Sequence, residues 1–212
     1  MKTNLGTAVM LLLLSLAISS CSNTKILYSK AEQQAKIKKQ SKVLVIAMMT
    51  DKDQKLRQNM ENIMVENLRK NGIEAGSSIA TFGINAFDKL DEATTISKIK
   101  SQGYDGAFTI ALLAKTKEKG YRPGRIATVY NPYRFWSYWN NYNSMFARMY
   151  IPPHYARDNK FIIEGNVFSL DSDQLVYSAQ TKTINPNSPE SLANSFTKTL
   201  LNDMYKNGVF SN

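Results

Sequence analysis

Apolar residues follow two patterns along the chain, the runs that are typical of strands and the repeat that is typical of helices. The order of these patterns predicts the secondary structure. Residues 42–49 (KVLVIAMM) form a continuous apolar run, which is typical of a strand buried on both faces. The stretches over residues 73–79 and 104–115 predict two further strands. Residues 159–184 predict two strands joined by a tight turn at residues 170–174, where the sequence is LDSDQ, so a β-hairpin is expected.

Segments whose apolar residues repeat with the period of an α-helix lie between these strands, and another such segment follows the last strand. The first predicted helix carries an apolar stripe made of Leu56, Met60, Ile63, Met64 and Leu68. A second helix is predicted over residues 91–103, with Ala93, Ile96 and Ile99 pointing inward. In the last helix, Ser188 is suited to the cap position and Pro189 to the first turn. Its apolar stripe consists of Leu192, Phe196, Leu200 and Met204.

The order of the elements predicts the fold class. Alternating strands and helices favour a parallel sheet with right-handed crossovers, and the hairpin and the last helix follow this unit. We therefore predict a single α/β domain with α+β character over residues 42–212, a βαβαβ unit followed by an antiparallel β-hairpin and a C-terminal helix. Three helices would pack on one mixed sheet. Residues 116–159 are too many for a plain connection and are predicted to form an insertion.

The N-terminus predicts export. Residues 1–20 contain one lysine, an apolar run and small residues before Cys21, which is typical of a secretory signal peptide. The ending ISSC resembles a bacterial lipobox, whose cysteine is linked to diacylglycerol, becomes the mature N-terminus and is N-acylated. Several acyl chains hold a protein stably on a membrane. The alternative is an ordinary signal peptide with an unrelated cysteine at its end. Ser22 resembles the sorting pattern for the outer membrane, so we expect lipidation of Cys21 and a location at the periplasmic face of that membrane.

Residues 21–41 are predicted to form a tether between the lipid and the domain. The stretch YSKAEQQAKIKKQSK is rich in Lys and Gln and too poor in apolar residues to order itself alone. A short helix is the alternative for this segment. In either case the lysines at positions 30, 36, 38, 39 and 42 would lie close to the lipid headgroups.

The net charge of +10 bears on the partners of the protein. An exported protein meets few nucleic acids, so we expect no nucleic-acid partner. The anions near it are phospholipid headgroups, lipopolysaccharide phosphates and acidic wall polymers. A basic surface that serves only solubility is an equal alternative.

Aromatic residues concentrate in residues 130–155, which hold ten of them, including both tryptophans. This segment follows the carboxyl end of a predicted parallel strand, the sheet edge at which ligands tend to bind. It could form a satellite core, a surface for self-association or an envelope protein partner, a loop facing the membrane, or a platform for a glycan or small ligand. The candidate binding residues are Tyr133, Arg134, Phe135, Trp136, Tyr138, Trp139, Tyr142, Phe146, Arg148 and Tyr150.

Catalytic signals are weak. His154 is the only histidine and Cys21 the only cysteine, so a nucleophilic triad or a zinc site lacks its usual residues. The chain has three aspartate pairs, Asp51/Asp53, Asp88/Asp91 and Asp171/Asp173. These pairs occur where helix capping and turns favour aspartate. No glycine-rich phosphate loop is present.

We therefore expect no metal, no cofactor and no enzymatic activity. The rival hypothesis is an enzyme or binding module acting on envelope glycans or lipids. An enzyme of this kind would bring Asp51, Asp88 and His154 together in one cleft.

Four stretches of the sequence resemble a known group of proteins. They are KVLVIAMM, LRQNMENIMVENLRKNGIEA, ISKIKSQGYDGAFTIALL and FIIEGNVFSLDSDQLVYSAQTKT, followed by a closing helix. They resemble uncharacterised Gram-negative envelope lipoproteins whose core is similar to the N-terminal domain of the Tol–Pal propeller protein and to the globular domain of the curli secretion channel lipoprotein. The resemblance covers residues 42–115 and 160–210 and rests on the order of the elements. It implies an envelope location and the fold predicted above, and it carries over no catalytic residue. We expect a lipid-anchored envelope protein with a non-enzymatic binding or assembly role.

Overall fold

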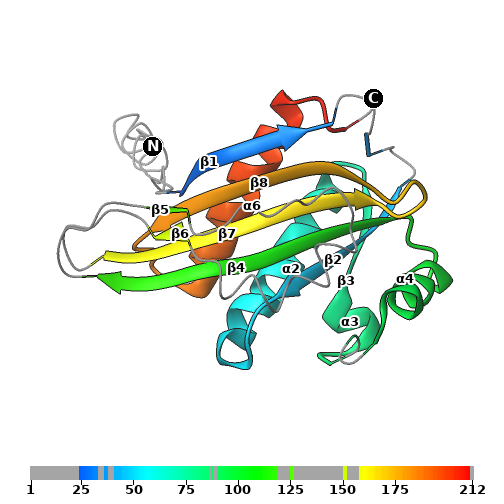
Figure 1. The fold of residues 1–212 in the computed structure, drawn as a ribbon, viewed down its shortest axis with the longest axis horizontal. Coiled ribbons are helices and arrows are strands. Elements are labelled where there is room, and N and C mark those ends of the chain that lie inside the picture. The colour runs from blue at the N-terminus through cyan, green and yellow to red at the C-terminus, as the bar shows by residue number, and fades with distance from the viewer. Residues whose placement is uncertain are drawn as a thin grey trace, which may run out of the picture.

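A six-stranded mixed sheet forms the centre of the computed structural model, with the strand order β1-β8-β7-β4-β2-β3 (Figure 1). The structure describes residues 24–32, 36–37, 41–85, 87, 90–118, 125–126, 150–151 and 158–210. The strands of the sheet are β1 (Thr24–Ala31), β2 (Lys42–Met48), β3 (Glu74–Ser77), β4 (Gly106–Glu118), β7 (Asp158–Ser169) and β8 (Gln174–Ile184). Two short strands, β5 (Arg125–Ile126) and β6 (Tyr150–Ile151), pair with each other in a separate sheet.

The directions of the strands confirm the predicted fold class. β2 runs parallel to β3 and to β4, while β4, β7 and β8 form the antiparallel part. The helices are α2 (Gln54–Lys70), α3 (Ser78–Phe82), α4 (Glu92–Ser101) and α6 (Pro189–Lys206), and a 3-10 turn, η1 (Asp51–Asp53), precedes α2. The single turn α3 was not predicted. No helix in the described part of the chain combines the length and the apolar content that a membrane crossing needs.

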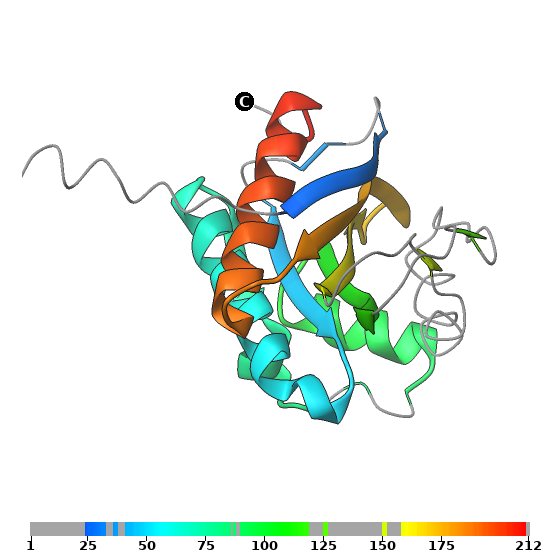
Figure 2. The ribbon, with the colours of Figure 1, turned by 90° about the vertical axis from the view of Figure 1, so that its left-hand side faces the viewer.

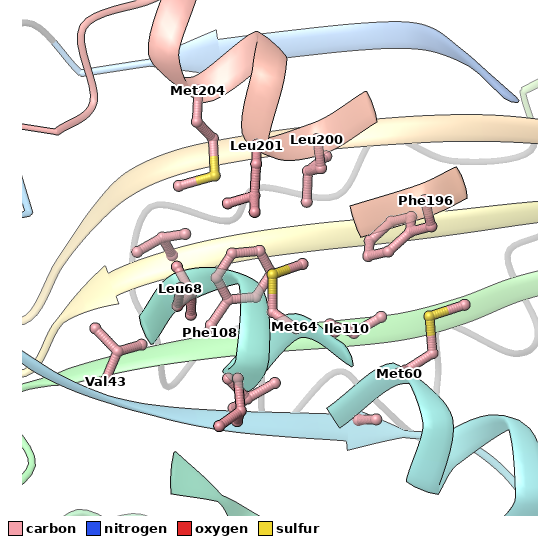
Figure 3. Close-up of a cluster of buried hydrophobic side chains, with 14 of the residues drawn as sticks. Val43, Met60, Met64, Leu68, Phe108, Ile110, Phe196, Leu200, Leu201 and Met204 are labelled. Atoms are coloured by element: carbon pink, nitrogen blue, oxygen red, sulfur yellow. The ribbon is translucent and has the colours of Figure 1, made fainter. Parts of the chain in front are cut away.

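One face of the sheet is covered by α2 and α6, and we call it the first face (Figure 2). The predicted stripes of both helices point into this core, where Met60, Met64 and Phe196 meet Phe108 and Ile110 of β4 (Figure 3). Packing here is close, because a Cβ added at Gly165 of β7 would lie 2.6 Å from the Leu200 side chain.

The other face, which we call the second face, carries α4 and a smaller apolar cluster (Figure 2). Leu44 and Ile46 of β2 pack there with Ile99 of α4. Of the three α4 residues predicted to point inward, Ala93 is exposed and Ile96 is half-buried, whereas the polar Thr95 is fully buried. The helix is therefore turned further toward Thr95 than its apolar pattern indicates.

The predicted ends of the long helices are present. Ser188 Oγ accepts a hydrogen bond from the Ser191 N–H at 3.0 Å, and Pro189 opens α6. Asp91 caps α4 in the same way, through a 2.9 Å bond from the Thr94 N–H. After α2, Gly72 adopts a φ of +79°, the left-handed geometry that ends a helix.

The prediction of a tether is wrong for Thr24–Ala31, because these eight residues form β1. β1 pairs antiparallel with β8 from Thr24 to Ala31 and forms one edge of the sheet. Ile26 packs against the core of the first face. An edge strand needs only one neighbour and one buried face, so a segment that cannot order itself alone is ordered by β8. Beyond β1, Ile37 is also buried and its N–H donates to the Val209 carbonyl at 2.9 Å.

Candidate functional site at one end of the sheet

Strand register brings several chain segments to the same end of the sheet. Thr24 is the Cα partner of Thr183, Thr183 is the partner of Phe161, and Phe161 is the partner of Lys115. This row crosses β1, β8, β7 and β4, and we call the end of the sheet beyond it the Thr24 end. The parallel strands β2 and β4 both point toward it, and β4 passes the row, whereas β2 ends level with Ala111. The opposite end carries Lys42 and is called the Lys42 end.

The predicted insertion is rooted at the Thr24 end. β4 runs to Glu118 and β7 begins at Asp158, and these two residues are Cα partners. The segment between the two strands is therefore residues 119–157, slightly shorter than the predicted 116–159. Nine of the ten predicted binding residues lie outside the described residues. For the tenth, Tyr150, the structure describes only the backbone, in β6. The lipidation candidate Cys21 also lies outside them.

Exposed basic side chains accompany these segments at the Thr24 end. Lys25 of β1 and Lys117 of β4 are exposed, and Lys182 of β8 is half-buried. Lys115 is paired, since its Nζ lies 2.7 Å from Asp53 Oδ1. The basic residues predicted to lie near the lipid are placed differently. Lys42 defines the opposite end, and Lys30 lies six residues along β1 from Thr24.

The described aspartates of the three pairs lie at helix starts and in the hairpin turn, as predicted, but the Asp53 side chain at the start of α2 makes no capping hydrogen bond. Asp53 accepts hydrogen bonds from Thr50 Oγ1 and Lys115, and Asp51 is exposed in η1. Asp171 and Asp173 lie in the hairpin turn, where Asp173 has a φ of +51°. Asp88 and His154 lie outside the described residues, so their predicted convergence with Asp51 stays a prediction. Within the described ranges, no three His, Cys, Asp or Glu side chains come together as a metal site requires.

A polar cluster is buried on the second face of the sheet, between β4, β7 and β8. Glu164 of β7 is 3% exposed, and its carboxylate accepts hydrogen bonds from Asn166 Nδ2 at 2.9 Å and from Gln180 Nε2 at 2.8 Å. The register explains both contacts. Gln180 is the Cα partner of Glu164, and Asn166 lies two residues further along the same strand and so on the same face.

The cluster is only partly satisfied. Burial raises the pKa of the Glu164 carboxyl, and the two amide hydrogen bonds oppose that shift without cancelling it. Two further oxygens of the cluster, Thr109 Oγ1 and Asn166 Oδ1, are buried and have no hydrogen-bond partner among the described residues. Thr109 and Asn166 are Cα partners across β4 and β7, so the two oxygens belong to neighbouring positions. A carboxyl with a raised pKa beside unpaired polar atoms is a pattern found in functional sites.

A second buried carboxylate, Glu61 of α2, is fully satisfied. Its Oε1 accepts from the Ala47 N–H at 2.9 Å and from Ser78 Oγ at 2.7 Å. Its Oε2 accepts from Ser77 Oγ at 2.6 Å and from the Ile79 N–H at 2.9 Å. The pairing of β3 with β2 stops at Val45, so Glu61 supplies the acceptor that Ala47 does not receive from β3. Glu61 therefore ties α2 to the end of β2 and to the start of α3.

A groove of about 330 Å³ lies at the Lys42 end, lined by Lys36, Ile37, Ser41 and Val43 and by the turn between β7 and β8. Its two carboxylates have partners. Asp105 Oδ1 accepts from the Lys42 N–H at 2.9 Å, and Asp171 lies 3.7 Å from Lys100 Nζ. These contacts do not place the two carboxylates opposite each other, as a catalytic pair requires.

Sequence reasoning did not single out Glu61 or Glu164. For Glu164 a signal exists, because Glu164 and Asn166 alternate with Ile163, Gly165 and Val167 in a strand that is otherwise apolar. Two polar residues on one face of a central strand indicate a buried polar site. For Glu61 the signal is weaker, since it follows Met60 at the border of the apolar stripe.

Comparisons with known proteins give no family. No protein-family model matches the sequence, and no curated protein matches it. Among solved structures, the chain is similar to the PelC dodecamer from Paraburkholderia phytofirmans, with 13% identity over 84% of this chain and 94% of that chain and a TM-score of 0.45. It is also similar to lipoprotein GNA1162 from Neisseria meningitidis, with 8% identity over 78% of this chain and 99% of that chain and a TM-score of 0.43. Similarity at this level carries no conclusion about function.

Proposed function

We propose that this chain is a lipid-anchored protein of the bacterial cell envelope with a binding or assembly role and no enzymatic activity of its own. The observation that carries the proposal is the arrangement at the Thr24 end. The lipobox cysteine precedes Thr24 by three positions, and the aromatic insertion leaves and re-enters the sheet at the same end.

The lipobox supports the envelope location. Cys21 follows a signal peptide and is the only cysteine, and Ser22 fits sorting to the outer membrane, whose periplasmic face is the proposed location. The proposed binding residues are the aromatic and arginine side chains of the insertion, such as Trp136, Trp139 and Arg148. Side chains of these types are the common anchors of protein interfaces. The proposed partner is an envelope protein or a second copy of this chain.

The non-enzymatic part of the proposal is supported by the partners of the described carboxylates. Asp53 lies in an ion pair, Asp91 caps a helix and Glu61 ties three elements together. The alternative is an enzyme or binding module acting on envelope glycans or lipids. The observation in its favour is Glu164, because burial and a raised pKa are properties of a general acid. Its described polar partners are amides, whereas a glycosidase needs a second carboxylate.

The lipid anchor is tested by Cys21→Ala, with Ser22→Ala as the matched control at the next position. Cys21→Ala should abolish incorporation of labelled palmitate and release the protein from the membrane fraction at high salt. Ser22→Ala should leave both unchanged. A Cys21→Ala protein that stays with the membrane at high salt would contradict the lipoprotein assignment.

The binding role is tested by a photo-reactive amino acid at position 139, with exposed Tyr205 at the Lys42 end as the control position. Crosslinking in cells should give discrete higher-mass products from position 139 and none from position 205. No product from position 139 would contradict the binding role. Hydrolysis of an envelope glycan or lipid by the purified protein, lost in Glu164→Gln, would support the enzyme alternative instead.

A further inference from the structure

The link between the proposed lipid and the folded domain is very short. Only Ser22 and Asn23 separate Cys21 from Thr24, the first residue of β1. Three residue steps of fully extended chain span at most about 11 Å. A tether of residues 21–41 would have let the domain move freely above the membrane, whereas this link holds it at the surface.

The point of attachment on the domain is fixed. Thr24 is buried, and its Oγ1 lies 2.7 Å from Thr183 Oγ1 of β8 and donates to Ser195 Oγ of α6 at 2.8 Å. β1 pairs with β8 from Thr24 itself, so no loose residues remain at the start of the strand. The link gains length only if these contacts break.

The register also shows which described strands extend past Thr24. Thr24 is level with Lys115 of β4 and with Phe161 of β7 in the cross-strand row. β4 continues for three residues beyond this row, to Glu118, and β7 begins at Asp158, three residues before it. Three strand residues span about 10 Å, which nearly equals the reach of the link. The tips of β4 and β7 therefore come as far toward the membrane as the lipid anchor does.

Exposed lysines flank the tips of β4 and β7, which themselves end in the acidic residues Glu118 and Asp158. The exposed basic residues of the Thr24 end and of the segment after β2 are Lys25, Lys52, Lys55 and Lys117. Among the side chains that the structure describes there, those of Asp51 and Glu190 are exposed and acidic. Phosphate-bearing headgroups attract such clusters of lysines within a Debye length of the membrane.

From the short link, the fixed start of β1 and the overhang of β4 and β7, we infer that lipidation holds the domain in one orientation, with the Thr24 end against the lipid surface. This inference rests on the proposed lipidation of Cys21. The Lys42 end then points away from the membrane, because β1 runs from Thr24 for eight residues, or about 25 Å. The roots of the aromatic insertion lie on the membrane side, which favours the membrane-facing interpretation of that segment.

The test uses the lipidated full-length protein in vesicles that contain phosphatidylglycerol. Lipidation consumes the only cysteine, so one introduced cysteine gives a unique site for a fluorescent label. Lys117→Cys places the label at the Thr24 end and Lys206→Cys places it at the end of α6, which lies at the Lys42 end. Lipids with a nitroxide on the headgroup should quench the first label at least threefold more than the second.

A linker variant is the matched control for the length of the link. Ten Gly and Ser residues inserted between Asn23 and Thr24 should bring quenching at the two positions close to equality. Equal quenching at both positions in the protein with its natural link, while it carries lipid and sediments with vesicles, would overturn the orientation and leave the anchor in place. A protein without lipid that does not sediment would instead contradict the proposed function.

The choice of lipid is tested by charge reversal, with a label at Lys52→Cys. Lys25→Glu with Lys117→Glu should lower quenching at position 52 about twofold in phosphatidylglycerol vesicles. The matched pair at the opposite end, Lys36→Glu with Lys206→Glu, should leave it unchanged. All four lysines are exposed and make no ion pair in the described part of the chain. An equal effect of the two pairs would overturn the contact between this end and anionic headgroups.

Discussion

Two buried glutamates give the clearest comparison within this fold. Glu61 lies where α2, β2 and α3 meet, and four donors, two of them backbone N–H groups, bind its two carboxylate oxygens. Glu164 lies in the polar cluster of the second face and receives two hydrogen bonds, both from side-chain amides. Both side chains are almost completely removed from solvent.

The two glutamates differ in how many of their hydrogen-bonding positions are satisfied. Glu61 has the contacts of a structural residue, whereas the contacts of Glu164 are not explained by stability alone. Donors at every position replace the water that a carboxylate loses on burial, so Glu61 holds three elements together. Glu164 lacks part of this compensation, its pKa is raised by burial, and two neighbouring oxygens are unpaired. Departures of this kind from a satisfied core are expected where a protein has a function to serve.

Removal of the Glu61 carboxylate is expected to lower the unfolding free energy more than any other change considered. A small loss would contradict the comparison of the two glutamates. Glu61→Ala leaves the N–H groups of Ala47 and Ile79 and two serine hydroxyls without their acceptor. The expected loss is about 4 kcal/mol of unfolding free energy, because each buried polar group left unpaired costs about 1–3 kcal/mol. Urea unfolding of the mature chain measures it.

The control for this prediction lies on the same helix. Glu66 is exposed and pairs only with Lys70, at 2.6 Å. Glu66→Ala should change the unfolding free energy by less than about 0.5 kcal/mol. A loss below about 1 kcal/mol for Glu61→Ala would show that water takes over the donors, and Glu61 would then not be a structural tie.

The sequence predicted those parts of the fold that depend on local periodicity. The stripes of α2 and α6 repeat over several turns, and the apolar runs of β2, β4 and the hairpin are long enough to identify strands. β1 escaped prediction because its order comes from pairing with β8, more than 150 residues away. Lys25, Tyr28 and Lys30 give it the polar appearance of a linker, which is common in an edge strand.

The buried polar contacts escaped prediction for the same reason. Glu61 looks like a surface residue of α2 until β2 and α3 are brought beside it. Glu164 and Asn166 show the right spacing for one face of a strand, but their neighbour Gln180 is set by the register of the hairpin. The aromatic insertion is the reverse case. Its composition is clear from the sequence, whereas its binding role stays a prediction.

The pH dependence of stability tests whether Glu164 differs from a satisfied buried carboxylate. A carboxyl whose pKa is raised in the folded state stabilises the fold below its unfolded pKa and loses that contribution as the pH rises through the folded value. The wild type should therefore lose stability relative to Glu164→Gln as the pH rises above the ordinary range of a glutamate. At pH 8 the variant should be more stable than the wild type, by a margin larger than at pH 5. Urea unfolding at pH 5 and pH 8 measures the difference, and parallel pH profiles of the two proteins would contradict it.

The smallest change in unfolding free energy is expected at Thr109. Here two buried hydroxyl groups are compared in place of two carboxylates. Thr109 Oγ1 is buried without a partner, whereas the equally buried Thr181 on the first face donates its hydroxyl to the Ile163 carbonyl at 3.2 Å. Valine has nearly the same shape as threonine. Thr109→Val should therefore raise the unfolding free energy by about 0.5 kcal/mol, because an uncompensated buried hydroxyl is removed.

The matched variant Thr181→Val should lower the unfolding free energy by about 1 kcal/mol, because it breaks a buried hydrogen bond. Opposite signs at these two threonines would show that the Thr109 hydroxyl is unsatisfied whereas the Thr181 hydroxyl is not. Within the described residues, Thr197 Oγ1 of α6 is also buried without a partner, so the contrast concerns these two positions and not whole faces. A loss at Thr109 as large as that at Thr181 would mean that the Thr109 hydroxyl has a partner in solution. The polar cluster would then be as complete as the surroundings of Glu61, and Glu164 would no longer mark a site apart from the core.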